Sequence, residues 1–426
     1  MDTLHLSRVS QELNTTQTPP DGLCEFVLNL TDKERANTFL YMPQEKWLFL
    51  FVLPLILVMG IITNSLFLYV VVTLKEMHTS TNFYLANLSF ADVFFLVVSI
   101  GNMMTQYLYS PIRRDWGRSQ QAGCCVFNFM VYLCYFGSIF LVTLLAVERY
   151  YAVCLPLKVL PLEGKRRSLK LTIYTWILAV IFAVAYLPRL ADYKTVCILW
   201  PNEEDYTGLP LLYGTCNPFY AWTDVFSAVT LILPFYIAFF TNCVLYALII
   251  RTLHKRVAIW GQAGDSTAAN DTSKVRNSIA RMLVVNGVLF FLCQAPFQST
   301  AFGSAIVDVV RQEPFFDYKH YLIWTWIAAI LVYLNSVINP IVFNAMSSRY
   351  REASKEALGW NKWKRRKWKS DRHMFLDPPA HGSFNLLSFL ISLVDHLSSL
   401  ISLVDHFSSL ALLITFSPGR SAHFSY

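Results

Sequence analysis

The chain has 426 residues, of which 55% are hydrophobic and only 15% are charged, and its mean hydropathy is +0.41. Soluble domains carry about 25% charged residues, so this composition excludes an ordinary soluble protein and indicates a membrane protein. The formal net charge of +7 does not indicate nucleic-acid binding, because the basic residues lie beside apolar segments rather than on a soluble domain.

Seven apolar runs before residue 345 are long enough to cross the hydrocarbon layer as helices, which takes ~20 residues. They cover residues 47–74, 82–109, 121–153, 170–190, 222–252, 277–307 and 319–343. A spanning segment must satisfy its backbone hydrogen bonds internally, and runs of this length do so as helices. The sequence therefore predicts an all-α membrane protein, a seven-transmembrane helix bundle over residues 47–343.

The basic residues beside these runs predict the orientation of the bundle. One side, which the positive-inside rule makes cytoplasmic, gathers Lys75, Lys158, Lys165, Arg166, Arg167, Lys170, Arg251, Lys255, Arg256, Lys274, Arg276, Arg349, Arg351 and Lys355. Arg113, Arg114 and Arg118 are a local exception on the other side. We expect a multi-pass protein of the plasma membrane with its N-terminus outside and its C-terminus in the cytoplasm.

The N-terminal tail, residues 1–46, is polar and shows no signal peptide, so the first helix is expected to direct insertion. It carries two glycosylation sequons, Asn14-Thr15-Thr16 and Asn29-Leu30-Thr31. Both lie on the side predicted to be extracellular, where glycans are attached. We therefore expect glycosylation at Asn14 and Asn29.

The outer face is also rich in cysteine. Five of the nine cysteines lie at or near it, namely Cys24, Cys124, Cys125, Cys197 and Cys216, and an odd number leaves one thiol free or paired elsewhere. Residues 191–221 alternate in a way that predicts a β-hairpin over the mouth of the bundle. A disulfide between Cys124, at the start of the third run, and Cys216, near the fifth, would tether this loop. The pairing of the other three stays open.

Asp92 is a carboxylate inside the second run, where such a group faces the bundle interior and needs partners. Polar side chains on three other runs can surround it: Asn64, Ser138, Asn335, Ser336 and Asn339. Oxygen ligands suit a hard cation, so a hydrated sodium ion is one interpretation. The alternative is a water-filled hydrogen-bond network that holds the helices together. No other cofactor is expected.

Residues 344–360 read as a short basic amphipathic helix on the cytoplasmic face. The tail that follows, residues 361–426, is expected to be largely disordered. Its basic run at 362–369 suits anionic membrane lipid or a partner, and equally a solvated tail. A ten-residue tandem repeat begins at Ile391 and again at Ile401, and it is assigned no function.

Several motifs occur at characteristic places in the runs: Asn64, Leu88-Ser89-Phe90-Ala91-Asp92, Cys124, Glu148-Arg149-Tyr150, Trp176, Pro296 and Asn339-Pro340. With the seven runs, they resemble the rhodopsin-like (class A) family of G-protein-coupled receptors over about residues 45–358. Residues 79–85 and 344–351 are similar to neuropeptide receptors for neuromedin U, thyrotropin-releasing hormone, ghrelin and neurotensin. The resemblance implies a heterotrimeric G protein as partner, together with arrestin and receptor kinases.

The resemblance also implies roles for individual residues. Arg149 is expected to be released on activation and to contact the G protein, while Glu148 restrains it at rest. The same machinery is expected to include Tyr150, Tyr246, Asn339 and Pro340. In the sixth run, the residues Phe290, Gln294 and Pro296 are expected to form a switch.

Three residues depart from the family pattern. Arg276 occupies the neighbourhood where the family has an acid on the sixth helix, so we expect less restraint and more basal activity. Gln294 replaces the tryptophan that usually precedes the sixth-helix proline. Phe343 replaces a tyrosine whose hydroxyl normally helps to hold the active state through water to Tyr246. These changes concern the switching mechanism and not the fold.

Val131 occupies the position at which amine receptors carry an aspartate, so a small amine is not the expected ligand. The mouth instead offers Gln106, Tyr132, Tyr135 and Gln298. We expect an extracellular peptide, C-terminally amidated and with a basic residue that acids of the outer loops attract. A lipid or small-molecule receptor is the alternative, and a seven-helix transporter is disfavoured because the halves show no repeat. No hydrolase or metalloprotease motif lies in the runs, so an enzyme is not expected.

Overall fold

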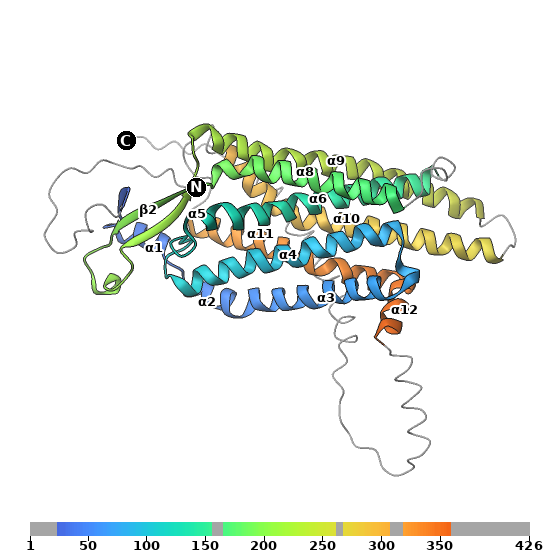
Figure 1. Ribbon diagram of the computed structural model, residues 1–426, viewed down its shortest axis with the longest axis horizontal. Coiled ribbons are helices and arrows are strands. Elements are labelled where there is room, and N and C mark those ends of the chain that lie inside the picture. Colours follow the sequence, from blue (N-terminus) through green and yellow to red (C-terminus); the bar gives the residue numbers. More distant parts are fainter. Residues whose placement is uncertain (1–23, 156–164, 261–266, 307–317, 359–426) are drawn as a thin grey trace, which may run out of the picture.

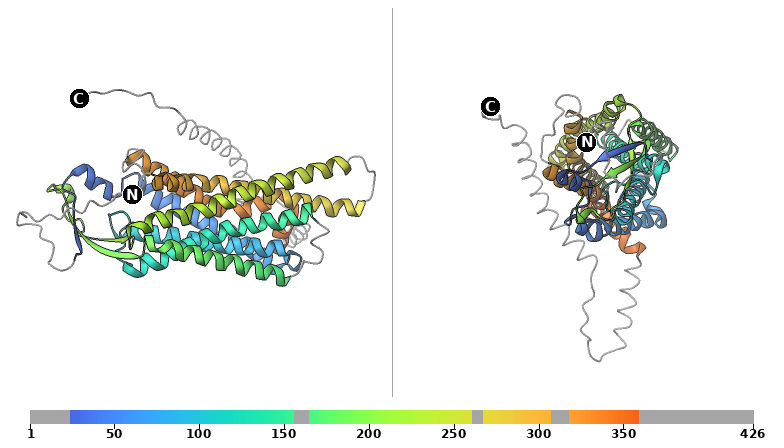
Figure 2. Two further views of the ribbon diagram at one scale, coloured as in Figure 1. Left: turned by 90° about the horizontal axis from the view of Figure 1, so that it is seen from above. Right: turned by 90° about the vertical axis from the view of Figure 1, so that its left-hand side faces the viewer.

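The computed structural model describes residues 24–155, 165–260, 267–306 and 318–358. Within these residues, seven helices are long and apolar enough to cross a membrane, which confirms the predicted bundle. The spans are Glu45–Thr73, Ser80–Tyr109, Gln120–Cys154, Arg166–Arg189, Trp222–Leu253, Ser278–Ile306 and His320–Met346. The helices lie side by side along one long axis (Figure 1), and the end-on view shows them grouped around a common centre (Figure 2).

The spans are built from the following elements. The first consists of α2 (Glu45–Trp47), a π-helical turn (Leu48–Val52) and α3 (Leu53–Thr73), and the second is α4 (Ser80–Tyr109). The third consists of α5 (Gln120–Ala122), a π-helical turn (Gly123–Phe127) and α6 (Asn128–Cys154). The remaining spans lie in α8 (Lys165–Tyr186) with a 3-10 turn (Leu187–Arg189), α9 (Ala221–Trp260), α10 (Thr267–Ile306) and α11 (Tyr318–Met346), and α12 (Ser348–Ala357) follows.

Local chemistry explains several helix boundaries. Thr79 caps α4, because its hydroxyl accepts the backbone N–H of Asn82 at 3.3 Å and so satisfies a donor that a helix start leaves unpaired. Pro234, Pro296 and Pro340 lie inside α9, α10 and α11, and each removes one backbone hydrogen bond. The helices continue through all three prolines, at the price of weaker local hydrogen bonding.

The helix α6 lies at the centre of the bundle and packs against α4, α8, α9 and α10. Its side chains Phe136 and Ile139 are completely buried. Gly137 allows α8 to approach closely, because a Cβ at this position would come within 3.0 Å of the Trp176 ring. Large apolar side chains on the outer faces are exposed, for example Phe240 of α9 at 63%, as expected where lipid covers the protein.

One end of the bundle, which we call the hairpin end, carries a three-stranded sheet. Strands β2 (Asp192–Leu199) and β3 (Leu212–Asn217) pair in antiparallel fashion, which confirms the predicted hairpin. Strand β1 (Phe26–Asn29) adds in parallel to β2. Two disulfides fasten this sheet: Cys24–Cys197 joins the N-terminal segment to β2, and the expected Cys124–Cys216 joins β3 to the third span.

The sheet and the short helix α1 (Lys33–Phe39) enclose an apolar core of their own, and together we call them the cap. Its buried residues are Leu28, Leu30, Ala36, Ile112, Val196, Ile198, Trp200 and Tyr206. Tyr206 donates its hydroxyl to Asn37 Oδ1 at 2.9 Å, which ties α1 to the hairpin. Residues 24–41, interpreted from the sequence only as part of a polar tail, therefore fold onto the hairpin.

The connection between the fifth and sixth spans is more helical than the sequence indicated. The fifth and sixth apolar runs were predicted to end at residue 252 and to begin at residue 277, whereas α9 continues to Trp260 and α10 already begins at Thr267. This correction has a simple reason: a helix makes its own backbone hydrogen bonds and continues beyond the membrane where residues permit. Asn14, the basic run at 362–369 and the tandem repeat lie outside the described residues.

The opposite end of the bundle, which we call the α12 end, carries the predicted amphipathic helix. Tyr350 and Ala353 of α12 are buried, and Tyr350 packs beside Phe67 of α3 and Phe343 of α11. The Tyr350 hydroxyl donates to Asn82 Oδ1 at the start of α4. The helix α12 is thereby fastened to three spans.

Candidate functional site

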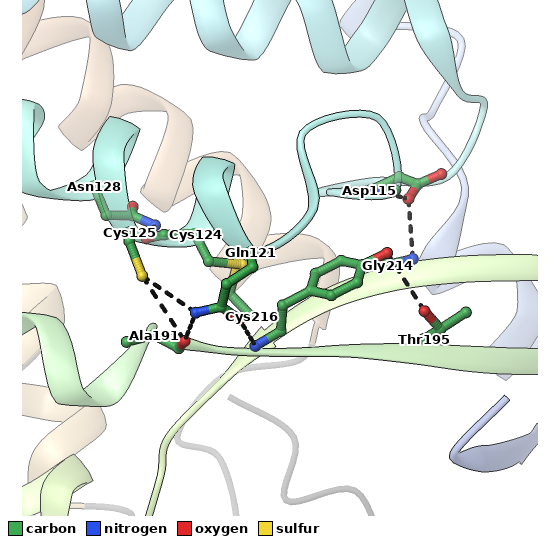
Figure 3. The surroundings of a disulfide bond; sticks show 11 residues. Asp115, Gln121, Cys124, Cys125, Asn128, Ala191, Thr195, Gly214 and Cys216 are labelled. Carbon is green, nitrogen blue, oxygen red and sulfur yellow. Dashed lines mark hydrogen bonds between the residues drawn. A yellow bond between two sulfur atoms is a disulfide. The ribbon is translucent and has the colours of Figure 1, made fainter.

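At the hairpin end, a polar cluster fixes the start of β2 to the third span (Figure 3). The amide of Gln121 donates to the carbonyl oxygen of Ala191 at 2.5 Å. The Cys125 thiol is free and lies 3.9 Å from the same carbonyl, while its neighbour Cys124 is bonded to Cys216. The hairpin is thus held over the bundle by a covalent bond and by hydrogen bonds.

The loop after α4 holds β3 from the other side. One carboxylate oxygen of Asp115 accepts the backbone N–H groups of Gly117 at 2.9 Å and Gly214 at 3.1 Å. The N–H of Trp116 donates to the Gly214 carbonyl at 2.9 Å. A Cβ on Gly214 would overlap the Gly117 backbone, so only glycine permits this approach. The loop after α4 therefore positions the cap, as the two disulfides do.

The structure pairs three of the predicted ligand residues with hydroxyl or amide partners. Tyr132 of α6 donates its hydroxyl to the Tyr186 hydroxyl of α8 at 3.0 Å, and the two ring centroids are 3.9 Å apart. The amide of Gln298 in α10 donates to the Tyr135 hydroxyl of α6. Val131, one turn before Tyr135, is half-buried and brings no charge. These contacts join α6, α8 and α10 through neutral groups.

Two amides at this site keep a buried polar atom without a hydrogen-bond partner among the described residues. They are the acceptor Oε1 of Gln298 and the donor Nε2 of Gln106. Gln298 is fully buried and Gln106 is 9% exposed. An unsatisfied buried polar group costs about 1–3 kcal/mol, so such atoms favour any ligand that can pair with them. The sequence indicated these residues, but it could not show that these atoms are unpaired.

Asp92 is 1% exposed, and its Oδ2 accepts a hydrogen bond from Asn339 Nδ2 at 2.7 Å. Asn64 donates to the backbone carbonyl of Ser336 at 2.8 Å, while its own Oδ1 is buried and has no partner in the described part of the chain. Ser138, Asn335 and Ser336 are buried as well. The structure thus brings Asp92 and Asn339 together, and the available donor set is one carboxylate with neutral oxygens. This chemistry fits a hard monovalent cation.

The predicted switch residues lie in the core of α10. Phe290 is completely buried and packs edge-on against Phe291, with ring centroids 5.2 Å apart. Gln294 is 4% exposed, and its Oε1 is a buried acceptor that lacks a partner in the part of the chain that the structure describes. Pro296 follows within the same helix. The place of the usual tryptophan is therefore filled by a smaller, polar side chain.

The predicted activation residues gather at the α12 end. Glu148 forms an ion pair with Arg167 of α8, with 2.7 Å between Oε1 and Nη2. The adjacent Arg149 has a buried Nε that lacks a hydrogen-bond partner among the described residues. Tyr150 packs against the cluster that contains Tyr246. Sequence reasoning missed Arg167, whose only signal was its membership of a basic run.

Tyr246 of α9 lies against α10. A Cβ on Gly287 would overlap the Tyr246 hydroxyl, so the glycine provides the space for this ring. Phe343 of α11 is completely buried. Pro340 lies inside α11. The backbone carbonyl oxygen of Pro340 accepts a hydrogen bond from Asn344 Nδ2 at 3.1 Å. The buried side chain at the end of α11 is therefore the apolar Phe343, and it lacks the tyrosine hydroxyl that the family pattern places there.

Two ion pairs at the hairpin end, one of them buried, were not predicted. Glu45 and Arg113 lie 2.5 Å apart, with side chains 6% and 11% exposed. The other Glu45 oxygen accepts the indole N–H of Trp326 at 2.8 Å. Arg189 lies 3.3 Å from Asp224. Arg113 was noted as an exception to the charge rule, and its partner explains why a basic residue is tolerated there.

The pKa values of three groups in the cap and its surroundings are shifted. Burial raises the pKa of Tyr41 to about 12. Burial also raises the pKa of Tyr213 in β3. The exposed Lys33 hydrogen-bonds to Glu203 at 2.7 Å, and this bond and the neighbouring charge raise the lysine pKa. Both tyrosines therefore stay neutral at physiological pH.

Seven spans, a disulfide-tethered hairpin and the Glu148-Arg149-Tyr150 end of the third span define a seven-transmembrane receptor. Residues 63–343 match the family described as 7 transmembrane receptor (rhodopsin family), and the chain belongs to this family. It is thus a class A G-protein-coupled receptor in a membrane, and not an enzyme or a transporter.

Individual relatives refine this placement. The chain is 28% identical to growth hormone secretagogue receptor type 1 of Homo sapiens over 321 residues, which cover 73% of this chain and 80% of the relative. It is 27% identical to the thyrotropin-releasing hormone receptor of Gallus gallus over 319 residues, covering 69% and 74%. It is 26% identical to neuromedin-U receptor 2 of Mus musculus over 343 residues, covering 77% and 78%.

Proposed function

We propose that this receptor binds an extracellular peptide at the hairpin end and activates a heterotrimeric G protein at the α12 end. In this orientation the N-terminus is outside the cell and the C-terminus is in the cytoplasm. Basic residues at the α12 end support it, whereas Arg113 and Arg189 at the hairpin end are neutralised by acids. Arrestin, receptor kinases and anionic lipid are expected cytoplasmic partners on the strength of family membership.

The observation that carries the peptide proposal is the neutral, amide-rich character of the ligand residues. Among the residues that the structure describes, Gln106 keeps a donor and Gln298 an acceptor without a partner, and Val131 brings no carboxylate to pair with an amine. A peptide supplies both donors and acceptors from its backbone or an amidated C-terminus. The relatives point the same way, because they are named for a growth hormone secretagogue, thyrotropin-releasing hormone and neuromedin U.

The mechanism we infer is a shift of population between two arrangements of the bundle. A peptide that binds the active arrangement more tightly favours it by the ratio of the two affinities. The contacts of Tyr135 with Gln298 link the ligand site to α6 and α10, which also carry Arg149 and Phe290. Displacement of α10 would open the α12 end, and Arg149 would then contact the G protein.

A sodium ion beside Asp92 is part of the same proposal. Asp92 would supply the charge, with oxygens of Ser138, Asn335, Ser336 and Asn339 as neutral ligands. When bound, the ion supplies positive charge that favours the arrangement of helices in which these residues converge. The buried Oδ1 of Asn64, which has no hydrogen-bond partner among the described residues, supports the fit, because it is an oxygen acceptor left to satisfy.

The test is a calcium and cyclic-AMP screen of cells that express the receptor, with a neuropeptide library as probe. A peptide agonist should signal in these cells and remain silent in vector controls and in cells expressing an Arg149→Ala variant at matched surface level. If no peptide signals while a lipid or an amine does so through the receptor, the ligand assignment is wrong and the alternative, a receptor for a non-peptide ligand, takes its place.

A further inference from the structure

A cavity of about 140 Å³ lies at the α12 end, lined by the start of α4, the end of α6, the start of α12 and one residue of α10. Its lining residues are Thr79, Thr81, Asn82, Arg149, Ile279, Arg349 and Tyr350. A single water needs only ~10–15 Å³ on this measure. The cavity therefore has room for a polyatomic ligand.

The lining is cationic. Among the residues that the structure describes, it contains Arg149 and Arg349 and no acidic residue. The nearest acid in sequence to Arg149 is Glu148, which is engaged in the ion pair with Arg167. Arg349 uses one nitrogen to donate to the backbone carbonyl of Glu76 at 2.6 Å. The buried Nε of Arg149 has no acceptor among the described residues. Two half-buried arginines, one of them with a buried nitrogen that lacks an acceptor, favour an anionic ligand.

Two helix N-termini add to this field. Thr81 and Asn82 belong to the first turn of α4, and Arg349 and Tyr350 belong to the first turn of α12. A helix start carries roughly half a positive charge and backbone N–H groups without helical partners. The cap residue of α12, Ser347, makes no capping hydrogen bond with its side chain. Both helix starts therefore favour the same kind of ligand as the arginines.

We propose that this cavity binds a phosphate dianion, either as free phosphate or as the phosphomonoester of a lipid headgroup. A phosphate group offers several acceptor oxygens, which match guanidinium donors better than a single point charge does. The Thr81 hydroxyl and the start of α12, which has no side-chain cap, supply further donors. Because Arg149 is part of the lining, an occupied cavity holds this residue away from the G protein. This last consequence rests on the proposed function, whereas the binding itself does not.

The experiment measures thermal unfolding of the purified full-length receptor in phosphatidylcholine nanodiscs. Inorganic phosphate is titrated at constant ionic strength, with chloride as the balancing anion. A second arm uses nanodiscs that contain 5% phosphatidylinositol 4-phosphate and no free phosphate. Neither arm contains agonist or G protein, so the outcome is independent of whether the receptor responds to a peptide.

We expect a saturable rise of the unfolding midpoint, roughly 3 °C, in the arm that contains the true source of the phosphate group. Arg349→Gln should weaken this effect at least about tenfold. The matched control is Arg351→Gln, since Arg351 lies on the same helix, is exposed and donates to the backbone carbonyls of Asn344 and Ala345. Thr81→Val is a second test that leaves both arginines in place and should also weaken binding.

A rise with free phosphate identifies a soluble ligand, and a rise only with the phosphoinositide identifies a lipid. No saturable rise in either arm overturns the proposal. An equal rise in wild type, Arg349→Gln and Thr81→Val overturns it as well, because the anion then acts elsewhere.

Discussion

Replacing Glu45 with glutamine removes the negative charge from a buried ion pair that joins the first span to the loop after α4. The carboxylate is 6% exposed, and one of its oxygens accepts from Arg113 at 2.5 Å and from the backbone N–H of Met42 at 2.7 Å. The other oxygen accepts from Trp326 of α11 at 2.8 Å. The Glu45 side chain thus connects the first span, the loop after α4 and the seventh span.

The expected loss follows from these contacts. Removing one member of a buried ion pair costs about 3–5 kcal/mol, because the other charge loses the partner that compensated its burial. The glutamine oxygen can still accept from Trp326, but its NH₂ group faces two donors, Arg113 and the Met42 N–H. We therefore expect Glu45→Gln to lower the free energy of unfolding by about 3 kcal/mol, at the lower end of that range.

The assay is a denaturant titration of the purified receptor, arranged as a double-mutant cycle. Glu45→Gln, Arg113→Gln and the double variant are compared with wild type. The double variant should lose less than the sum of the single losses, since it leaves no unpaired charge. Lys33→Gln provides the control, because Lys33 and Glu203 form an exposed pair with 55% and 46% exposed side chains. Exposed pairs of this kind contribute little, and no measurable change is expected.

The reasoning is refuted if Glu45→Gln stays within about 0.5 kcal/mol of wild type, the usual range for surface substitutions. It is also refuted if the single losses simply add, because additivity would mean that the two groups do not interact.

Three further predictions concern the sodium site, basal activity and alkaline pH. Sodium chloride should raise the unfolding midpoint above its value in potassium chloride, and Asp92→Asn should abolish the difference; equal midpoints in wild type would contradict the sodium proposal. Ligand-free signalling should be higher in wild type than in Arg276→Glu at matched surface level, and no difference would remove the link to the missing acid. Because burial raises the pKa of Tyr41 to about 12, stability should fall as the pH rises from about 10 to 12 and fall less in Tyr41→Phe, as alkaline unfolding would show.

The seven spans could be predicted because the requirement is local: each run is apolar over the thickness of a bilayer and makes its own hydrogen bonds. The Cys124–Cys216 disulfide and the hairpin were also predictable, because the positions of the spans determine where the two cysteines lie. Asp92 and Asn339 were brought together correctly for the same reason. A polar side chain within a span is excluded from the lipid and therefore faces the interior of the bundle, where it meets the other polar side chains.

The cap could not be predicted, because its contacts are remote in sequence. Cys24 and Cys197 are separated by 173 residues, and β1 is only four residues long. Phe26 and Leu28 are too short a pattern to identify a strand without knowledge of its partner β2. The role of Arg113 was hidden in the same way, because Glu45 lies in an earlier segment that reads as a helix start. Non-local pairing is what the sequence alone does not reveal.

The atoms that lack hydrogen-bond partners at the candidate sites could not be predicted from the sequence either. Gln106, Gln294 and Gln298 were singled out by their positions, yet which of their atoms lacks a partner depends on the packing of neighbouring helices. The cationic cavity at the α12 end was missed entirely, since Arg149 and Arg349 lie 200 positions apart in the chain.

The most direct test of the central claim is nucleotide exchange on a purified heterotrimeric G protein by the receptor in nanodiscs. The account predicts that a peptide identified in the cell screen accelerates exchange by the wild-type receptor, and that Arg149→Ala abolishes this acceleration while peptide binding persists. Binding of the peptide without any acceleration of exchange on representatives of the G-protein subtypes would contradict the assignment of this chain as a peptide-activated, G-protein-coupled receptor.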